Sequence, residues 1–337
     1  MIREAIQALV SGKSLNMDEA SSVMVEIMEG KVTPAQFGAF VTALRLKGET
    51  VDEIAGMAKV MRAKAIRVTV ADPVIDIVGT GGDGLNSFNI STVTAFVVAG
   101  AGLKVAKHGN RAASSQCGSA DVLEALGVKL ELTAGQVKRC IEEAGIGFMF
   151  AQAFHPAMKY AGPPRREIGI RTVFNILGPL TNPAGAKNYL LGVADGSLVE
   201  KMAQVLKSLG CNHALVVHGE DGLDEITISG PSQVCELKGG RIKKFKVSPE
   251  DFGLPTASLE SLNGGTAQEN ASLLRKILAG ASGAPRDVVL INAAAALVAG
   301  DRVETLRQGM DLARQAIDSG RALAKLEQLI RLTRSFA

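Results

Sequence analysis

Two short segments hold the densest groups of residues able to do chemistry. The first, residues 79–84, reads Gly-Thr-Gly-Gly-Asp-Gly and exposes successive backbone N–H groups that a ligand can approach closely. A predicted helix begins soon afterwards, at Asn-Ile-Ser-Thr (89–92), and a helix N-terminus favours anions. We therefore expect a phosphate or diphosphate ligand. The spacing matches neither the dinucleotide motif nor the Walker loop, and an ordinary strand–helix turn is the alternative.

The second segment, residues 107–115, reads Lys-His-Gly-Asn-Arg-Ala-Ala-Ser-Ser. It follows a predicted strand, and open α/β sheets bind ligands at the carboxyl ends of their strands. Its ammonium, guanidinium, imidazole, amide and hydroxyl groups make it a candidate anion site. A solvated basic loop is the alternative. Ser119 offers a further hydroxyl, or simply caps the helix that follows it.

Clear helix signals define residues 1–65. Asn16, Thr33 and Thr50 are typical N-cap residues, and the last two are followed three residues later by Gln or Glu. We expect one helix from Asn16 to near Gly30, one that ends at Gly48, and one that begins at 51. This region shows no strand pattern, so it is predicted to be a small all-helical domain.

The rest of the chain predicts an α/β domain with a mostly parallel central sheet flanked by helices. Strands are expected at 74–78, 103–106, 189–193 and 214–217, helices at 92–99, 120–126, 134–144 and 198–209, an antiparallel meander at 226–228, 233–237 and 241–247, and helices again from 267. The predicted domains are therefore 1–65 and 66–337, joined by a segment near 165–190.

The composition excludes several classes of protein. The 337 residues are 47% hydrophobic and 21% charged, with a net charge of +3, which does not favour a dedicated nucleic-acid binder. No apolar stretch reaches the roughly 20 residues of a membrane helix. The four cysteines are scattered without a CxxC pair, which is typical of reduced thiols. We expect a soluble cytoplasmic protein.

Further motifs extend through the whole chain. Together with the two loops, segments 154–159, 165–169, 174–183, 224–225, 249–253 and 269–271 resemble the phosphoribosyltransferases that act on anthranilate, a family grouped with the pyrimidine nucleoside phosphorylases. Motifs of this length and order are highly specific. One departure is Ser87, where the family usually has threonine, and the substitution keeps the hydroxyl.

The resemblance implies a homodimer that binds substrates between its helical and α/β domains. It also implies a reaction in which the phosphoribosyl group of 5-phosphoribosyl 1-pyrophosphate passes to the amine of anthranilate. The products would be N-(5-phosphoribosyl)anthranilate and pyrophosphate, in the second step of tryptophan biosynthesis from chorismate. Mg²⁺ is the implied cofactor, and hard oxygen ligands with retained waters suit it.

The resemblance also implies roles for individual residues. The donor would be surrounded by Gly79, Gly82, Asp83, Ser87, Asn89, Ile90, Ser91, Thr92, Lys107, His108, Gly109, Asn110, Arg111, Ala112, Ala113, Ser114, Ser115 and Ser119. Anthranilate would contact Gly79, Asn110 and Arg165, with His108, His155 and Pro179 along its path, and Mg²⁺ would be held by Ser91, Asp224 and Glu225. Lys107 and His108 are the implied catalytic residues.

Several of these residues have ordinary alternatives. Taken alone, Asp224-Glu225 is typical of a solvated turn, and Arg165 of a surface ion pair, for instance with Glu167. Among enzymes, the alternative is a pyrimidine nucleoside phosphorylase, which would need a base pocket in place of a carboxylate site. A non-catalytic, nucleic-acid-binding relative would have lost the glycine loop and the acidic pair. The sequence names no general base and no anthranilate synthase partner.

Overall fold

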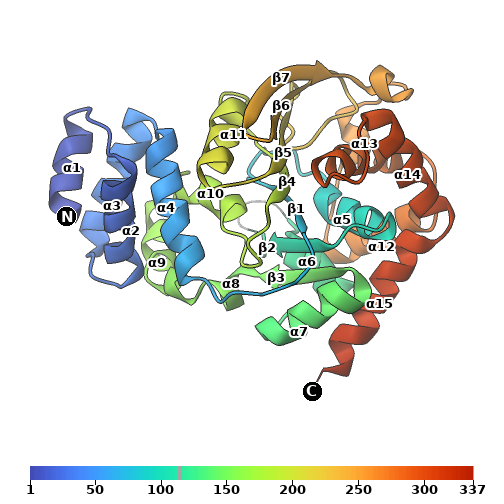
Figure 1. Ribbon diagram of the computed structural model, residues 1–337, viewed down its shortest axis with the longest axis horizontal. Helices are drawn as coiled ribbons and strands as arrows, with labels where there is room; N and C mark the ends of the chain where they lie inside the picture. Colours follow the sequence, from blue (N-terminus) through green and yellow to red (C-terminus); the bar gives the residue numbers. More distant parts are fainter. Residues whose placement is uncertain (113–115, 337) are drawn as a thin grey trace.

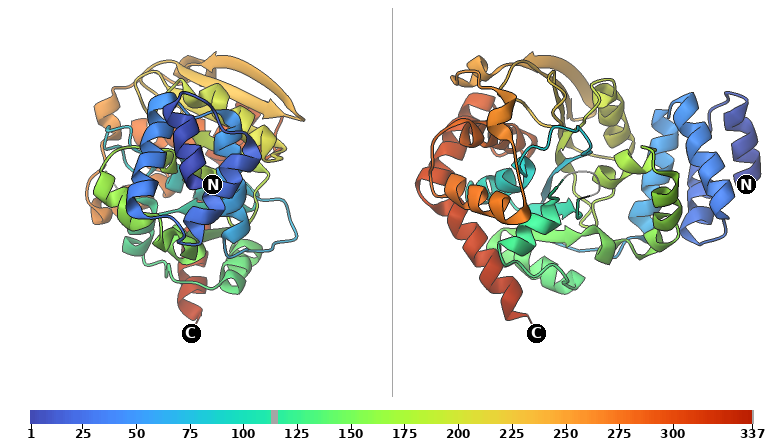
Figure 2. Two further views of the ribbon diagram at one scale, coloured as in Figure 1. Left: turned by 90° about the vertical axis from the view of Figure 1, so that its left-hand side faces the viewer. Right: turned by 180° about the vertical axis from the view of Figure 1, so that it is seen from behind.

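The computed structural model describes residues 1–112 and 116–336. Its first four helices are α1 (Ile2–Val10), α2 (Met17–Met28), α3 (Pro34–Lys47) and α4 (Val51–Lys64). The predicted caps are confirmed, because the side chains of Asn16, Thr33 and Thr50 accept backbone N–H groups at the starts of α2, α3 and α4. Gly48 ends α3 with a φ of +87°. The helices form a bundle at one end of the molecule (Figure 2).

A seven-stranded sheet lies at the centre of the remaining chain, in the order β3-β2-β1-β4-β5-β6-β7. The parallel strands are β1 (Ile75–Gly79), β2 (Val105–Gly109), β3 (Ile146–Phe150), β4 (Asn188–Gly192) and β5 (His213–Gly219). β6 (Ser232–Lys238) and β7 (Arg241–Val247) add an antiparallel hairpin at one edge. The predicted fold class, a helical domain plus a mostly parallel α/β domain, is confirmed.

Helices cover both faces of this sheet (Figure 1). α5 (Ile90–Gly100) and α13 (Ala284–Ala299) pack on one face, and α11 (Leu198–Ser208) packs on the other. α14 (Leu306–Asp318) and α15 (Arg321–Ser335) form an outer layer over α5 and α13. The other helices of this domain include α6 (Ser119–Ala125), α7 (Ala134–Arg139), α8 (Ala151–Phe154) and α12 (Ala267–Leu278). None of the described helices is long and apolar enough to span a bilayer.

The segment between β3 and β4 links the bundle to the sheet domain. Its helices α9 (Gly162–Ile168) and α10 (Phe174–Leu177) contact α3 and α4 respectively. The rings of Phe37 and Phe174 lie 5.4 Å apart, and Arg62 of α4 donates to the carbonyl of Leu180 at 2.6 Å. This contact region overlaps the segment predicted to join the domains.

The structure corrects two expectations about strands. Residues 226–228 form no strand. Their backbone N–H groups donate to side chains and not to a neighbouring strand: Ile226 donates to the Asn292 amide oxygen, and Thr227 to the Ser232 hydroxyl. Conversely, β3 was not expected, although its sequence Ile-Gly-Phe-Met-Phe is buried throughout. The predicted helix at 134–144 is divided into α7 and a π-helical turn over Cys140–Ala144.

Candidate active site

The carboxyl ends of β1 and β4 meet where the strand order reverses. β1 pairs with β4 along its whole length, ending with Gly79 opposite Gly192, and open α/β sheets bind ligands outside such a switch point. Asp224 occupies the gap beyond these strands. A Cβ on Gly79 would lie 2.3 Å from its Oδ2, and a Cβ on Gly192 would lie 1.6 Å from its carbonyl oxygen. Both strand-terminal glycines are therefore needed for Asp224 to come this close.

The glycine loop that follows β1 is held from two sides. Gly81 and Gly82 have φ angles of +64° and +72°, in the region that favours glycine. The N–H of Gly81 donates to Asp224 Oδ2 at 2.7 Å. The guanidinium of Arg171 donates to the carbonyls of Gly82 and Gly81 at 2.5 and 3.0 Å. A side chain on Gly82 would meet Arg171 before any ligand, since its Cβ would lie 1.7 Å from the guanidinium.

The acidic pair is not a solvated turn. Burial, followed by repulsion from Asp83, raises the pKa of Asp224 to about 6. Burial, followed by repulsion from Asp224, raises the pKa of Glu225 well above its usual range, and Lys107 opposes the shift. In addition, Oδ2 of Asp83 is buried and makes no hydrogen bond of acceptable geometry within the described residues. This region therefore has a surplus of negative charge that a bound cation would neutralise.

Lys107 lies beneath the site, not at its surface. Its side chain is 3% exposed, and Nζ donates to the Ile77 carbonyl at 2.6 Å and to Ser91 Oγ at 3.2 Å. Burial lowers the pKa of Lys107, while the neighbouring carboxylates, Asp76 foremost, oppose that shift. Its ammonium is thus positioned to balance buried carboxylates and to orient the Ser91 hydroxyl.

Side chains replace part of the ladder between β1 and β2. Only the first residues of these two strands pair in register. Farther along, Asp76 accepts the backbone N–H of His108 at 3.2 Å and the amide of Asn182 at 2.7 Å. Asn182 also donates to the Ala106 carbonyl at 2.8 Å. Burial raises the pKa of Asp76 to about 6. This network fixes the strand end that carries His108.

The residues present fit a magnesium ion bound with a diphosphate. Asp224, Glu225 and Asp83 supply carboxylates, and Ser91 contributes a hydroxyl at the start of α5, where its backbone N–H hydrogen-bonds to Glu225. Along 1–112 and 116–336, no group of three or more His, Cys, Asp or Glu side chains is placed to hold a metal ion by itself. Mg²⁺ commonly uses only one or two carboxylates, with waters and substrate phosphates completing its shell.

The residues at the start of α5 divide between packing and backbone roles. Asn89 uses its side chain within the protein, donating to the Cys117 carbonyl at 3.0 Å and accepting from Asn270 at 3.1 Å. The side chains of Ile90 and Thr92 are buried. The backbone N–H groups of these two residues are used within the protein as well, Ile90 donating to the Phe88 carbonyl at 2.6 Å and Thr92 to the Asn89 carbonyl at 3.0 Å.

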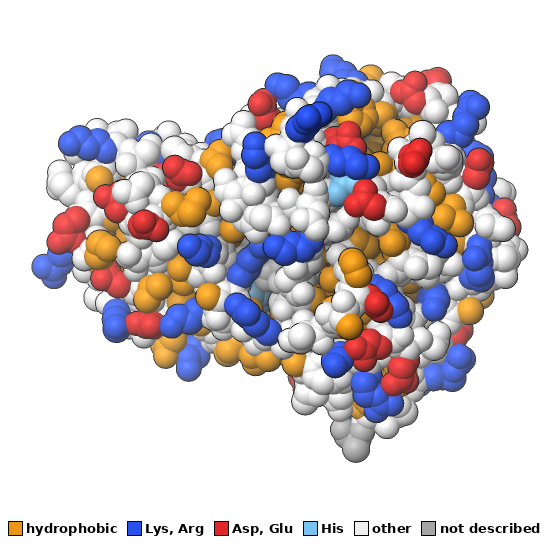
Figure 3. Space-filling view, viewed as in Figure 1, with side chains coloured by type: hydrophobic (Ala, Val, Ile, Leu, Met, Phe, Trp, Pro, Cys, Tyr) orange, Lys and Arg blue, Asp and Glu red, His pale blue; other side chains and the backbone are white. Residues whose placement is uncertain are grey.

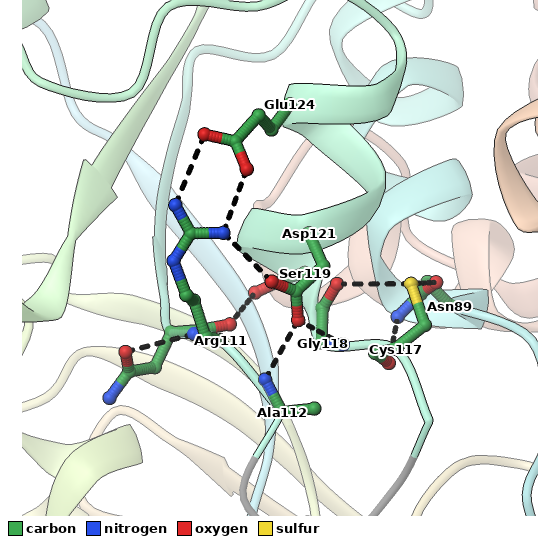
Figure 4. Close-up of polar contacts among 9 residues, drawn as sticks. Asn89, Arg111, Ala112, Cys117, Gly118, Ser119, Asp121 and Glu124 are labelled. Atoms are coloured by element: carbon green, nitrogen blue, oxygen red, sulfur yellow. Dashed lines mark hydrogen bonds and ion pairs between the residues drawn. The ribbon is translucent and has the colours of Figure 1, made fainter. Parts of the chain in front are cut away.

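Arg111 points towards α6 (Figure 4). Its guanidinium contacts Asp121 at 2.9 Å and forms a fork with Glu124 at 2.8 and 3.1 Å. Asp121 also accepts the backbone N–H groups of Ala112 and Gly118, both at 2.9 Å. In this arrangement Arg111 is neutralised and ties the loop to α6. The predicted donor ligands Ala113, Ser114 and Ser115 lie outside the described residues.

The start of α6 adjoins the end of β2. Ser119 is the first residue of the helix and Gly118 is its N-cap, which corrects the expected capping role of Ser119. The Ser119 hydroxyl donates to the Asn110 carbonyl at 3.3 Å (Figure 4). Gly109 permits this approach, because a Cβ there would lie 2.3 Å from Ser119 Oγ.

Two neutral histidines lie together beyond β2. The rings of His108 and His155 are 5.0 Å apart, and His108 Nδ1 lies 3.2 Å from the Gly178 carbonyl oxygen. Burial, then the neighbouring His155, lowers the pKa of His108 to about 3. Burial lowers the pKa of His155 to about 4. Nε2 of each ring has no hydrogen-bond partner among the described residues. Pro179, also predicted to lie here, is buried nearby in the chain.

Arg165 carries a positive charge that no carboxylate among the described residues balances. Its guanidinium lies over the Phe174 ring, 5.3 Å from the centroid, and burial lowers its pKa. In the part of the chain that the structure describes, neither Glu167 nor any other carboxylate forms an ion pair with it. Lys and Arg side chains also gather across the middle of the face in Figure 3, between the bundle and the sheet domain.

The structure gathers most of the predicted residues around the ends of β1, β2 and β4. Ser87 forms an isolated antiparallel bridge with Asn263. No role was predicted for Arg171, Asp76 or Asn182, which hold the loops in place. Asp76 did carry a signal, since it is a lone carboxylate within the apolar run Val-Ile-Asp-Ile-Val.

Comparison with protein families identifies the class. The model of the family described as "Glycosyl transferase family, helical bundle domain" matches residues 3–65. The model described as "Glycosyl transferase family, a/b domain" matches residues 71–323. The second match alone covers more than half of the chain. The chain belongs to this glycosyl transferase family.

Within that family, its relatives are anthranilate phosphoribosyltransferases. The protein of that name from Dehalococcoides mccartyi is 62% identical over 339 residues, covering 100% of this chain and 99% of the relative. The crystal structure of the Thermus thermophilus enzyme superimposes with a TM-score of 0.93 at 46% identity, over 98% of this chain and 99% of that one. The family resemblance found in the motifs is confirmed.

Solved structures of the Saccharomyces cerevisiae enzyme bear on ligands. One, in complex with phosphoribosyl pyrophosphate and Mg, superimposes with a TM-score of 0.92 at 28% identity, covering 99% of this chain and 98% of that one. Another is in complex with 4-fluoroanthranilate, with a TM-score of 0.89, 28% identity and the same coverage.

Proposed function

We propose that this chain joins the amine of anthranilate to C1 of phosphoribosyl pyrophosphate and releases pyrophosphate, as its relatives are named for doing. The N–C1 bond forms as the bond from C1 to the pyrophosphate oxygen breaks, and the amine loses one proton. The observation that carries the proposal is the acidic pair at the end of β1, in which Glu225 is buried and Asp224 is partly buried. With Asp83 beside it and only Lys107 opposing its charge, the pair calls for a cation of the kind that accompanies a diphosphate.

The donor is assigned to the end of β1 and the start of α5. Asp224, Glu225 and Ser91 are the proposed magnesium ligands, some through water, with Asp83 close by. When bound, the ion would neutralise negative charge that builds up on the departing pyrophosphate. Backbone N–H groups of the glycine loop would bind diphosphate oxygens.

Lys107 is proposed to stabilise the negatively charged ligands of the metal without touching the diphosphate. Because its Nζ hydrogen-bonds to Ser91 and lies near the carboxylates, it stabilises the arrangement of the oxygen ligands. His108 is proposed to face the acceptor. With its pKa lowered to about 3 it is neutral at physiological pH, so it can accept a hydrogen bond from the anthranilate amine.

The acceptor is assigned to the region between β2 and α9. Arg165 would bind the carboxylate of anthranilate through charge-assisted hydrogen bonds. Its support is the absence of a carboxylate partner within the described residues and its place over Phe174. Asn110 and the backbone of Gly79 are the other proposed contacts.

A homodimer and a cytoplasmic location complete the proposal. Leu46 of α3 is 83% exposed, an apolar side chain on the bundle that a second copy of the chain would cover. All four cysteines are buried, as suits thiols in a reducing compartment. Sedimentation of the wild type and of Leu46→Glu tests the dimer, which the variant should weaken.

The activity is tested with purified protein, anthranilate, phosphoribosyl pyrophosphate and Mg²⁺, following the loss of anthranilate fluorescence. Uridine with inorganic phosphate serves as the matched test for a pyrimidine nucleoside phosphorylase. Consumption of anthranilate without phosphorolysis of uridine is expected. Phosphorolysis of uridine with anthranilate untouched would return the function to the phosphorylase.

A further inference from the structure

The acidic pair has no regular secondary structure of its own. Asp224 and Glu225 lie in the connection between β5 and β6, which forms no strand over 220–231. Backbone groups outside the ladder need hydrogen-bond partners from elsewhere in the protein, because a buried N–H or C=O without one is costly. Something outside the ladder must therefore hold this backbone.

Asn292 holds it on one side. It lies in the middle of α13, where it is 0% exposed among apolar residues. Its Oδ1 accepts the N–H of Ile226 at 3.0 Å, and its Nδ2 donates to the Ile226 carbonyl at 2.9 Å and to the Val288 carbonyl at 2.9 Å. A single amide thus pairs with both polar groups of the residue that follows Glu225, as a neighbouring strand would do.

Asp221 holds the connection on the other side. Its Oδ2 accepts from the hydroxyls of Thr227 and Ser229, each at 2.5 Å. Its Oδ1 accepts the N–H of Leu223 at 3.1 Å. In the sequence, the acidic pair therefore lies between two sets of hydrogen bonds. One set is centred on Asp221, and the other holds Ile226.

We propose that Asn292 and Asp221 are positioning residues that hold Asp224 and Glu225 in the geometry needed to bind the divalent cation with the diphosphate. The inference rests on the proposed function of the acidic pair. Neither residue needs to touch a substrate. A buried amide in an apolar helix is costly unless every polar atom is paired, and here the pairing is directed at the metal-binding backbone.

The test measures metal binding directly. Mn²⁺ is titrated into the full-length protein with phosphoribosyl pyrophosphate and without anthranilate, and the free ion is followed by electron paramagnetic resonance. Asn292→Ala and Asp221→Ala should each weaken Mn²⁺ binding by roughly tenfold or more, in the range seen when the partners of metal ligands are removed. The KM for anthranilate should not change.

Two further variants separate positioning from stability. Leu290→Ala, in the same helix, removes buried apolar volume without a hydrogen bond to the connection, and should lower the melting temperature while leaving Mn²⁺ affinity intact. Asp221→Asn should restore most of the affinity lost in Asp221→Ala, because its carbonyl still accepts from Leu223 and the two hydroxyls can reorient. Asp221 is only partly buried, so its variants should fold even if Asn292→Ala does not.

The outcomes distinguish the two levels of the proposal. If Asp224→Asn with Glu225→Gln weakens Mn²⁺ binding but the Asn292 and Asp221 variants bind like Leu290→Ala, the positioning role is wrong and the metal assignment stands. If the double variant also binds Mn²⁺ like the wild type, the metal assignment itself is wrong, and the positioning role with it.

Discussion

The two sides of the site carry opposite charges. The side around Asp224 is negative, and the side around Arg165 is positive. Around Asp224 the buried groups are carboxylates, opposed chiefly by the Lys107 ammonium. The Arg165 guanidinium lies over the ring of Phe174. Buried charge is costly without a partner. A magnesium-bound diphosphate would complete the first side, and the carboxylate of anthranilate would complete the second.

Arg111 and Arg165 differ in whether carboxylates of the protein balance their charge. Arg111 is forked onto Glu124 and bonded to Asp121, so its charge is satisfied within the protein (Figure 4). Arg165 has no such partner among the described residues and is partly withdrawn from water. Only an arginine of the second kind has its charge available for a ligand.

The largest effect is expected from removing the charge on the acidic side. Asp224→Asn with Glu225→Gln should lower turnover by roughly 100-fold or more at a Mg²⁺ concentration that saturates the wild type, by analogy with the loss of a transition-state clamp. Excess Mg²⁺ should restore part of the rate. Circular dichroism controls for folding, and an unchanged Mg²⁺ titration would mean that the pair holds no metal.

Removing the buried ammonium should mainly cost stability. Lys107→Ala leaves Asp76 and the acidic pair without their cation, and breaking a buried pair on one side costs about 3–5 kcal/mol. Urea unfolding measures the loss in the free energy of unfolding. Adding Asp76→Asn to this variant should recover part of that loss. A loss below that of an ordinary surface substitution would show that Lys107 balances no buried charge.

The acidic side also predicts a dependence of stability on pH. Asp224 and Asp76 have folded-state pKa values raised to about 6. Each therefore contributes stability that is fully present below the usual carboxyl pKa and is lost as the pH rises through about 6. Without metal, these two carboxyls should favour the folded protein at pH 5 over pH 7, while Mg²⁺ binding should be weaker at pH 5. The buried His108 and His155 act in the opposite direction, because their pKa values are lowered to about 3 and 4 and each loses stability as the pH falls below its usual value. The change in the free energy of unfolding from pH 7 to pH 5 should therefore be less favourable to folding in Asp224→Asn than in the wild type; an equal change would exclude Asp224 as a contributor.

The smallest effect is expected at Arg111. Because its guanidinium is substantially exposed, Arg111→Ala should cost about 1 kcal/mol or less in the free energy of unfolding. The KM for anthranilate should stay unchanged, in contrast to an Arg165 variant. A large rise in the KM for the acceptor would show that the carboxylates on α6 release Arg111 to bind substrate.

Local signals in the sequence were enough to predict the helix caps of the bundle, the parallel strands β1, β2, β4 and β5, and the two loops. Thr33 and Thr50 begin helices because capping depends on residues only three positions apart. Residues 226–228 were predicted wrongly because what replaces a strand partner is Asn292, 66 positions away. The alternating pattern of apolar residues carries no information about that contact.

Charged residues were the hardest to assign from sequence. Arg111 and Arg165 both stand in specific motifs, and the partners of Arg111 lie only 10 and 13 positions along the chain. Their distinct roles depend on how α6 faces the loop and on which carboxylates reach each guanidinium. Arg171 looks like a surface arginine in the sequence, yet it holds the glycine loop from a segment about 90 residues away.

The central claim is that each side of the site binds a substrate group of opposite charge. A variant of Arg165 tests this claim most directly. The values of kcat/KM for anthranilate and for aniline are measured with the wild type, Arg165→Ala and the control Arg166→Ala. Losing a hydrogen bond to a charged group costs ~1.5–3 kcal/mol, roughly 10- to 100-fold. Arg165→Ala should therefore lose that factor with anthranilate and little with aniline, while Arg166→Ala behaves like the wild type. Equal losses with both acceptors would show that Arg165 acts on the fold or the donor and does not recognise the carboxylate.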